Sequence, residues 1–367
     1  MTAQISDAAN GNGSRDAAIR RFLKIAKSLG LFALCRYMTR RQLRILCYHG
    51  VWLGGAPHYG DCLFMDSDRF ARRVEFLARL GYPVLPLEDA IDQLAADSIP
   101  DNAIAITIDD AWYSTHSRML PVLKRYAMPA TLYVTTYYAT AGKPVLNVMI
   151  GYMVARASRI PDLDAIFAGE LDAAGSATDA DNERDRLAAA ISRRIDALPS
   201  LDARWRELER IAGVFGFNLD AMVADRRFDL MNSEEIRAAS ADGFDIQLHT
   251  HTHRMHEFDP GGIANEVERN RTALAHILDV PADSLVHFCY PSGMYAPRVF
   301  DTLRELGVRS ATTTEFGLNP AGMEPLALKR ILDCDSMSEI ELEARLCGFW
   351  SLVVRAKRYL EPSGKRQ

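Results

Sequence analysis

The stretch AIAITIDDAW, residues 103–112, determines how the rest of the chain is interpreted. Residues 103–108 form an almost unbroken apolar run, which is typical of a strand buried on both faces of a parallel sheet. Asp109 and Asp110 follow at once, at the carboxyl-end rim where active sites of α/β folds gather. Adjacent carboxylates point different ways, so we expect one to ligate a metal and the other to handle protons. Turns and helix caps use the same residue pair, so the pair alone does not establish a site.

Apolar runs of strand type and helical patterns alternate on both sides of this stretch. We predict strands at residues 43–51, 82–87, 103–108, 130–135, 244–248, 285–290, 310–313 and 328–332, and helices at 66–80, 88–96, 117–126 and after Asn232. Such alternation predicts an α/β fold with a parallel sheet that helices cover, either doubly wound or closed into a barrel.

Residues 146–228 interrupt the alternation with Asp/Ala-rich stretches and helical patterns, so we expect a helical insertion that shapes the substrate entrance. The core domain would span residues 43–335 around this insertion. Residues 1–14 are small and polar and are expected to form a disordered tail. Residues 336–367 are expected to form a C-terminal helix and a basic tail.

The overall composition is that of an ordinary globular protein. The net charge of -5 gives no overall field that would attract nucleic acid. The six cysteines lie far apart without a C-x-x-C pair, so we expect reduced, mostly buried thiols. The N-terminus lacks the features of a secretory signal, and no stretch approaches the ~18 apolar residues of a membrane span. We therefore expect a cytoplasmic location.

The segment 15–42 is predicted to be a basic amphipathic helix. Nine Lys and Arg residues lie between positions 15 and 44 against a single acidic residue, Asp16, with apolar residues interleaved. This pattern fits a helix packed on the domain and equally one that contacts a membrane surface. Peripheral contact with the inner face of the membrane is therefore an alternative to a purely cytoplasmic location.

A histidine cluster follows the predicted strand at 244–248. The sequence HTHTH places three of the nine histidines within residues 249–253. A single histidine is more often a packed or surface residue than a ligand, but His249 and His253, at i and i+4 near a strand end, can converge on one ion. Two imidazoles and a carboxylate, with further positions left to water, are typical of a catalytic zinc-type site.

A turn is predicted at Tyr290-Pro291-Ser292-Gly293, directly after another predicted strand. Glycine lets the backbone come close to a ligand, and proline fixes the direction of approach. Backbone N–H groups there are candidates for stabilising an oxyanion, although such a sequence is more often an ordinary tight turn.

Together these residues resemble the polysaccharide deacetylase family, also known as the NodB homology domain or carbohydrate esterase family four. The family's Thr-Phe-Asp-Asp-Gly, His-[Ser/Thr]-x-x-His and groove motifs have counterparts at residues 107–111, 249–253 and 289–293, and LCYHGV at 46–51 resembles the start of one bacterial subgroup. The resemblance covers about residues 43–145 and 229–335. It implies an irregular (β/α) barrel with fewer than eight complete units.

The resemblance also implies roles for individual residues. Asp109 would be the base, and Asp110, His249 and His253 would hold a divalent metal, most often Zn²⁺, with Co²⁺ or Ni²⁺ as alternatives. A metal-bound water would attack the amide, and the N–H of Ser292 would stabilise the oxyanion. The implied activity removes N-acetyl groups from an amino sugar in a polysaccharide or lipid-linked glycan.

The chain departs from the family pattern at three places. Ala111 replaces the glycine of the first motif, so we expect the backbone at this position to avoid a strained conformation. Ser292 replaces an aromatic residue of the groove. The family's late Leu-x-His motif, whose histidine protonates the leaving amine, has no counterpart near residues 328–331.

His49 is the candidate for the missing acid, although a packing role fits it as well, and Arg330 is expected to orient Asp109. Three rival functions remain. The first is another amidase, such as a deformylase acting on a lipid-linked amino sugar. The second is a catalytically silent glycan-binding relative. The third is a membrane-peripheral assembly protein that binds lipid through residues 15–44.

Overall fold

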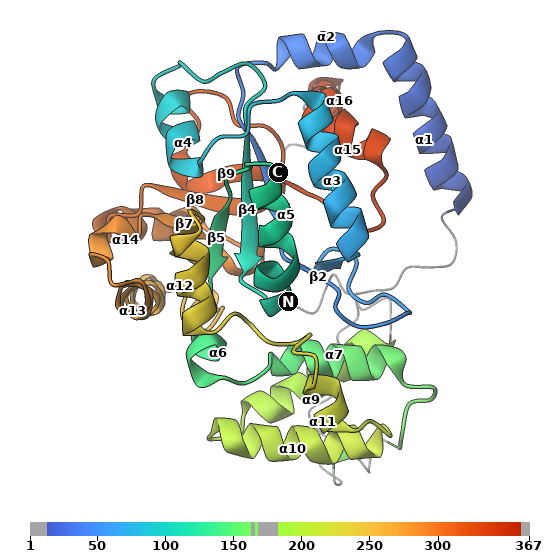
Figure 1. The fold of residues 1–367 in the computed structure, drawn as a ribbon, viewed down its shortest axis with the longest axis vertical. Coiled ribbons are helices and arrows are strands. Elements are labelled where there is room, and N and C mark those ends of the chain that lie inside the picture. Colours follow the sequence, from blue (N-terminus) through green and yellow to red (C-terminus); the bar gives the residue numbers. More distant parts are fainter. Residues whose placement is uncertain (1–12, 163–165, 168–182, 361–367) are drawn as a thin grey trace.

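The computed structural model describes residues 13–162, 166–167 and 183–360 (Figure 1). Residues 1–12 of the predicted tail and residues 361–367 of the predicted basic tail lie outside the described residues. Helix α1 (Gly13–Ser28) begins within the last two positions of the predicted tail. Within the described ranges, no helix combines the length and apolar character needed to cross a membrane.

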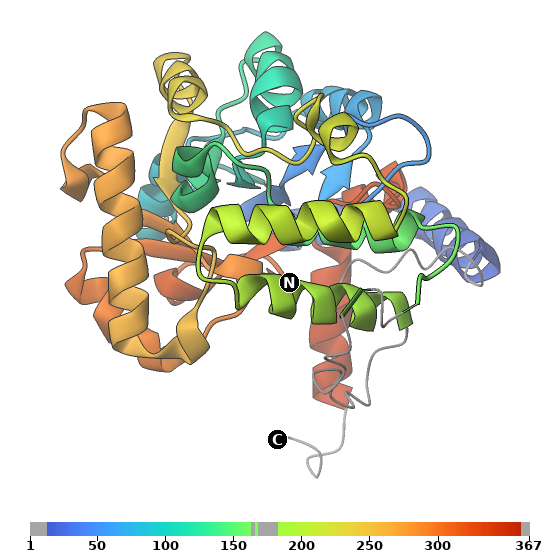
Figure 2. The same ribbon diagram turned by 90° about the horizontal axis from the view of Figure 1, so that it is seen from below.

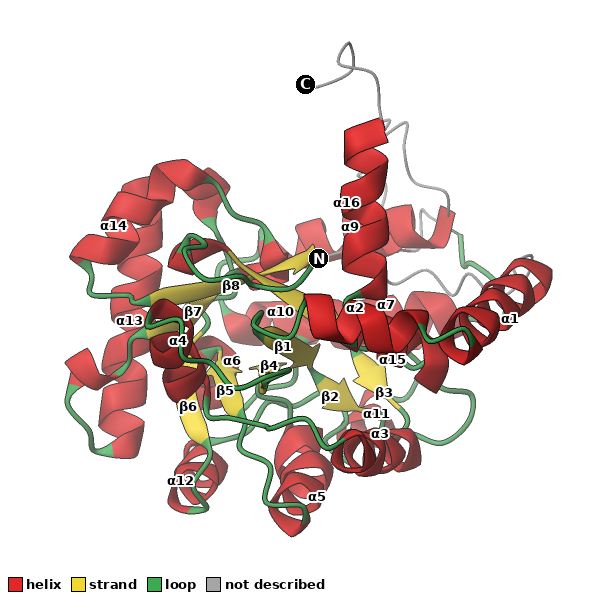
Figure 3. Ribbon diagram, turned by 90° about the horizontal axis from the view of Figure 1, so that it is seen from above, coloured by secondary structure: helices red, strands yellow, loops and turns green. Residues whose placement is uncertain are grey.

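Seven parallel strands form a closed barrel, which Figure 3 shows from above with helices around it. This confirms the predicted irregular (β/α) barrel. Strand β9 closes the barrel by pairing with β1, through Leu46 with Ile331 and Cys47 with Leu332. In barrel order the strands are β1 (Arg44–Tyr48), β4 (Ile104–Asp110), β5 (Thr131–Val134), β6 (Asp245–Leu248), β7 (His287–Cys289), β8 (Ser310–Phe316) and β9 (Leu328–Leu332). A separate two-stranded sheet pairs β2 (Gly50–Val51) with β3 (Phe64–Met65).

The predicted strand at residues 82–87 is wrong. Only Val84 makes an isolated bridge, to Ile104, and helix α4 (Leu87–Ala95) already begins at the end of this segment. Pro83 and Pro86 have no backbone N–H to donate, so the segment cannot sustain a ladder of hydrogen bonds. The barrel therefore has one strand fewer than the sequence pattern predicts.

Helices cover the outside of the barrel, and local sequence signals set several of their ends. The Asp66 side chain accepts a hydrogen bond from the Arg69 N–H at the start of α3, and Asn232 and Glu235 form a capping box at the start of α12. The outer helices are α3 (Ser67–Leu80), α5 (Leu120–Arg125), α6 (Thr136–Ala141), α12 (Ser233–Ala241), α13 (Pro260–Leu278) and α14 (Phe300–Glu305). Short 3-10 or π turns lie at Thr115–Met119, His256–Phe258, Ala282–Ser284, Pro291–Gly293, Pro297–Val299 and Pro325–Ala327.

Helices occupy the described part of residues 146–228, and they lie across one end of the barrel (Figures 1 and 2). They are α7 (Leu146–Arg156), α9 (Glu183–Asp196), α10 (Leu201–Val214) and α11 (Leu219–Val223). Their apolar residues form one cluster with Trp52, Phe64 and Trp112 from segments that follow barrel strands. Burial of this shared cluster fixes the insertion beside the last residues of β4.

The two ends of the described chain pack against each other. Helices α1 and α2 (Leu31–Met38) lie against α15 (Glu339–Leu346) and α16 (Phe349–Leu360). Leu23, Ala26, Phe32 and Cys35 are buried in this contact together with Phe349. One face of the predicted basic helix is therefore packed on the domain.

The expectation that all six cysteines are reduced is wrong, because Cys62 and Cys334 form a disulfide. Cys62 lies in the loop that follows β2, and Cys334 follows β9. The chain segments after β1 and β9 come together because these strands are neighbours in the barrel, although the two cysteines are 272 positions apart. Disulfides persist mainly in oxidising compartments, so the cysteine content no longer supports a cytoplasmic location.

Candidate active site

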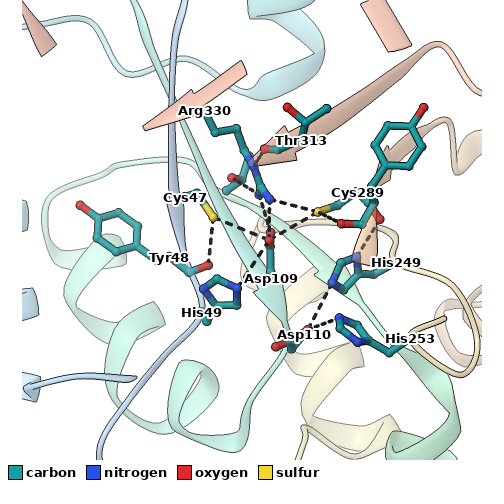
Figure 4. A network of polar contacts seen from close by, with 12 residues as sticks. Cys47, Tyr48, His49, Asp109, Asp110, His249, His253, Cys289, Thr313 and Arg330 are labelled. Carbon is teal, nitrogen blue, oxygen red and sulfur yellow. Dashed lines mark hydrogen bonds and ion pairs between the residues drawn. The ribbon is translucent and has the colours of Figure 1, made fainter. Parts of the chain in front are cut away.

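Asp109 and Asp110 are the last two residues of β4, and the backbone sends their side chains to different partners (Figure 4). Asp110 has a φ of 68° and Ala111 a φ of 60°, both in the left-handed region. The expectation that Ala111 avoids strained geometry is therefore wrong. This fully buried alanine adopts a conformation that glycine takes freely, at a cost of roughly 1–2 kcal/mol for an L-residue.

Three donor groups converge at Asp110, His249 and His253. The Oδ1 of Asp110 lies 3.2 Å from the Nε2 of His249 and 3.2 Å from the Nε2 of His253. All three donor atoms lie within 4.8 Å of one another. Two imidazole nitrogens and one carboxylate oxygen form the donor set of many catalytic zinc sites, so these residues fit a divalent ion of that kind.

Neighbouring groups hold these donors in place. The Nδ1 of His249 donates to the carbonyl oxygen of Cys289 at 2.8 Å, which leaves Nε2 unprotonated in the neutral ring and directed at Asp110. The indole Nε1 of Trp112 donates to Oδ2 of Asp110 at 3.0 Å, so Oδ1 is the oxygen that faces the histidines. Burial would raise the pKa of Asp110, but the nearby histidines, His253 above all, lower it well below its usual range. The carboxylate is therefore ionised, as a metal ligand must be.

Two polar residues of α13 support the loop that carries the histidines, and the sequence interpretation missed both. The side chain of Asn270 accepts from the N–H of His249 at 2.9 Å and donates to the carbonyl oxygen of Val134 at 2.9 Å. Glu266 accepts from the N–H of Thr252 at 2.7 Å and from its hydroxyl at 2.9 Å. Glu266 and Asn270 are spaced i, i+4 on the buried face of a helix. Their position as two polar residues in an otherwise apolar helical stripe is the sequence feature from which both could have been predicted.

Arg330 holds Asp109 inside the barrel through two parallel hydrogen bonds. Its Nη1 and Nη2 each lie 2.7 Å from an oxygen of Asp109, and its Nε donates to the carbonyl oxygen of Thr313 at 2.7 Å. Burial would raise the pKa of Asp109, but the charge and hydrogen bonds of Arg330 outweigh it and lower the pKa to about 2. Asp109 is therefore a fixed, ionised carboxylate beside the cluster of donors.

His49 follows β1 and faces the same carboxylate. Its Nε2 lies 3.8 Å from Oδ2 of Asp109, and its buried Nδ1 has no hydrogen-bond partner among the described residues. Burial lowers the pKa of His49 in spite of the two nearby aspartates. The thiols of Cys47 and Cys289 also point to Oδ2 of Asp109, at 3.6 and 3.4 Å. The structure thus brings His49 and Arg330 to Asp109 from opposite sides (Figure 4).

The turn Pro291–Gly293 lies beside this site, but its residues differ in their surroundings. The Tyr290 side chain is buried, and its hydroxyl donates to the carbonyl oxygen of Leu326 at 2.9 Å, away from the donors. Pro291 and Ser292 line the cavity described below. Gly293 has a φ of 66°, and a Cβ at this position would overlap the side chain of Thr314. The turn therefore requires glycine at that position.

A cavity of about 710 Å³ extends from the donor cluster to the insertion. Asp110, His253 and Ser292 lie on its barrel side, and Trp112 and Tyr138 add aromatic surface. The insertion contributes the opposite wall with Asn147 and Val148 from α7 and Ala189, Ser192, Arg193 and Asp196 from α9. The described residues of the barrel and of the insertion therefore share the walls of one cavity that reaches the donors.

Comparison with known families places these residues in context. A family model described as "Polysaccharide deacetylase" matches residues 96–155 and 213–311. The matched segments contain β4 to β7 and both donor motifs, and the gap between them falls within the insertion. The protein YxkH of Bacillus subtilis (strain 168), provisionally described as a polysaccharide deacetylase, is 30% identical over 93 residues. That alignment spans 25% of this chain and 31% of the length of YxkH.

Solved structures share the fold at low sequence identity. The Streptococcus pyogenes deacetylase PplD, determined in complex with acetate, aligns with a TM-score of 0.54 and 18% identity over 84% of this chain and 99% of its own. A polysaccharide deacetylase from Bacillus cereus aligns with a TM-score of 0.51 and 16% identity over 84% of this chain and 69% of its own. Fold and site together define a (β/α)-barrel protein with a cluster of candidate metal ligands at one end of the barrel. The chain is similar to polysaccharide deacetylases over the strands that carry both donor motifs.

Proposed function

We propose that the protein is a metal-dependent hydrolase that removes N-acetyl groups from an amino sugar in a polysaccharide or a lipid-linked glycan. The observation that carries this proposal is the convergence of Asp110, His249 and His253 beside a separately held carboxylate, Asp109. The family match supports it. The acetate bound by PplD, which is the expected product of deacetylation, also supports it.

Asp110, His249 and His253 would hold the divalent ion, for which Zn²⁺ is our first choice and Co²⁺ or Ni²⁺ the alternatives. The ion would supply Lewis acidity to the acetyl carbonyl and lower the pKa of water. The Nε2 of both histidines and the Oδ1 of Asp110 are directed to one point. The cavity that Asp110 and His253 line would hold the sugar beside that point.

Asp109 is the proposed base. Its carboxylate is ionised and fixed by Arg330, so it can accept a proton from the attacking water without reorientation. With a pKa of about 2 it is a weak base, because efficient proton acceptors have a pKa near the working pH. We therefore propose that the proton does not remain on Asp109.

His49 is the proposed acceptor of that proton and its donor to the leaving amine. Its Nε2 lies 3.8 Å from Asp109, close enough for a transfer after a small rotation of the His49 ring. As the carbon–nitrogen bond breaks, the amine nitrogen takes this proton and the carbonyl carbon keeps the oxygen of the water. The acetic acid so formed loses the second proton of the water to the solvent and leaves as acetate. The backbone N–H of Ser292, on the wall of the cavity, is the proposed donor to the oxyanion.

The test measures acetate release from N-acetylglucosamine oligomers and from lipid-linked N-acetyl sugars. Metal-stripped protein should be inactive and should regain activity with zinc or cobalt. The variant His253→Ala should lose both metal binding and activity. His276→Ala, which removes an exposed histidine at the far end of α13, is the matched control and should lose neither.

A second variant separates the base from the metal ligands. Asp109→Asn should bind zinc with nearly the affinity of the wild type but release acetate at least ~100-fold more slowly. Zinc binding without release of acetate from any of these substrates would contradict the proposed activity. Release of formate from a formylated amino sugar would then favour the deformylase.

A further inference from the structure

Large exposed apolar side chains gather on one part of the molecule. Of the nine that the described residues leave exposed, seven lie on α1, on α2 or between them, and Leu29 is 72% exposed. A cluster of this kind marks an interaction site, whereas scattered apolar residues are normal on any surface. We call these seven residues the α1–α2 apolar face: Phe22, Ile25, Leu29, Leu31, Leu34, Tyr37 and Met38.

The packing of the two helices onto the domain uses this face only at its edge, where the ring of the half-exposed Phe22 lies 6.0 Å from that of Phe349. Leu23 and Ala26 of α1 and Phe32 and Cys35 of α2 are the residues buried against the C-terminal helices. The exposed positions 22, 25 and 29 are spaced i, i+3 and i+7, so they form a second stripe along α1 and the residue that follows it. The fold of the described chain therefore accounts for one apolar stripe and leaves most of the other uncovered.

Basic side chains flank the uncovered stripe. Arg21 and Lys24 are exposed, and each directly precedes an exposed apolar residue. Within the described part of the chain, no carboxylate lies at ion-pair distance from either of them, whereas Lys27 pairs with Glu343 at 2.6 Å on the packed side. The whole chain carries a net charge of -5, so this positive charge is a local feature.

We propose that the α1–α2 apolar face binds the surface of an anionic phospholipid bilayer. Apolar side chains beside Lys and Arg suit the boundary between acyl chains and negatively charged headgroups. A second copy of the same face would bring Arg21 and Lys24 of two molecules together, and that repulsion disfavours a homodimer. Because the described helices are unsuited to crossing a bilayer, the contact would be peripheral.

The position of this face makes the proposal independent of the chemistry of the site. Helix α2 lies at the end of the barrel opposite the insertion, and α1 runs down one side (Figure 1). The donor cluster lies at the insertion end, next to α7 and α9. Membrane contact would therefore recruit the protein without placing lipid in the cavity, and variants of the face should not change the turnover of a soluble substrate.

Flotation of the full chain with vesicles tests the proposal. We expect binding to vesicles of phosphatidylcholine mixed with phosphatidylglycerol, weak binding to phosphatidylcholine alone, and release as the salt concentration rises. Arg21→Glu with Lys24→Glu should weaken binding by at least about tenfold. Arg118→Glu with Arg125→Glu makes the same change in net charge at exposed sites elsewhere and should leave binding within about twofold.

The apolar contribution is tested separately with Phe22→Ser and Leu29→Ser, which should also weaken binding by at least about tenfold. Thermal unfolding checks that each variant is folded. If a double variant does not fold, Lys24→Gln and the salt dependence of the wild type decide the question. The proposal is overturned if the wild type does not float with anionic vesicles, or if both charge-reversal pairs weaken binding equally. It is also overturned if the apolar variant dissolves a dimer and leaves vesicle binding unchanged.

Discussion

Replacing Arg330 with methionine removes the partner of a buried carboxylate and tests how Asp109 is held. In the wild type, burial would raise the pKa of Asp109, but Arg330 outweighs this effect and lowers the pKa from 3.8 to about 2. Asp109 therefore contributes about 2 kcal/mol of stability at neutral pH. Because the folded pKa is the lower one, this contribution is lost as the pH falls through the folded pKa.

The variant should reverse the sign of this pH dependence. Without Arg330, burial is the largest remaining effect and is opposed only by His49 and His249, so we expect the pKa of Asp109 to rise above 3.8 and the folded state to disfavour the ionised form. Destabilisation should then grow as the pH rises above the unfolded pKa. Removing one partner of a buried ion pair costs about 3–5 kcal/mol, and we expect a loss of this size at neutral pH and a much smaller loss near the unfolded pKa.

Urea unfolding followed by tryptophan fluorescence, repeated over a pH series, measures both effects. The protein must be metal-stripped, because a bound ion would stabilise the folded state by mass action. The double variant Arg330→Met with Asp109→Asn leaves neither charge in the barrel and should recover most of the lost stability at neutral pH. The reasoning is refuted if Arg330→Met costs less than ~1 kcal/mol or keeps the pH dependence of the wild type. A double variant no more stable than the single one would refute it equally.

Three further substitutions test backbone and covalent features. Ala111→Gly should change the free energy of unfolding by less than about 1 kcal/mol, because relief of the left-handed φ offsets the loss of a buried methyl group. Ala111→Val should lower the free energy of unfolding by more than about 2 kcal/mol in the same urea assay. Gly293→Ala should lower the thermal midpoint and the affinity for substrate, since the new Cβ overlaps Thr314 beside the cavity. Cys62→Ser should remove the bond to Cys334 and cost about 2–5 kcal/mol, and a reducing agent should destabilise the wild type but not the variant.

Sequence patterns predicted most of the barrel because parallel strands buried on both faces leave a strong local signal. All seven residues of β4 are buried, which is why residues 103–108 appear as an almost unbroken apolar run. The one wrong strand, at 82–87, has the same apolar character, and only its two prolines argued against it. Apolar composition therefore predicts burial more reliably than it predicts a ladder of hydrogen bonds.

Pairings between distant segments were the part that the sequence could not supply. The disulfide of Cys62 with Cys334 depends on β1 and β9 being neighbours, which no local pattern shows. The contacts of Glu266 and Asn270 with the histidine loop depend in the same way on where α13 packs. Residues that present donors follow strand ends and can be predicted, whereas residues that orient those donors come from elements placed by the whole fold.

Residues that orient the donors also explain how the site tolerates alanine in place of the glycine of the family motif at position 111. Ala111 has a left-handed backbone conformation. Two contacts keep this residue in place: its carbonyl oxygen accepts a hydrogen bond from the N–H of Met231 at 2.8 Å, and its side chain is fully buried. The adjacent Asp110 is fixed by Trp112 on one oxygen and by two histidines near the other. Contacts on both sides of the strained residue therefore maintain a geometry that its own backbone preference opposes. The glycine of the family motif lowers the cost of this turn, but the direction of the carboxylate is set by the surrounding contacts.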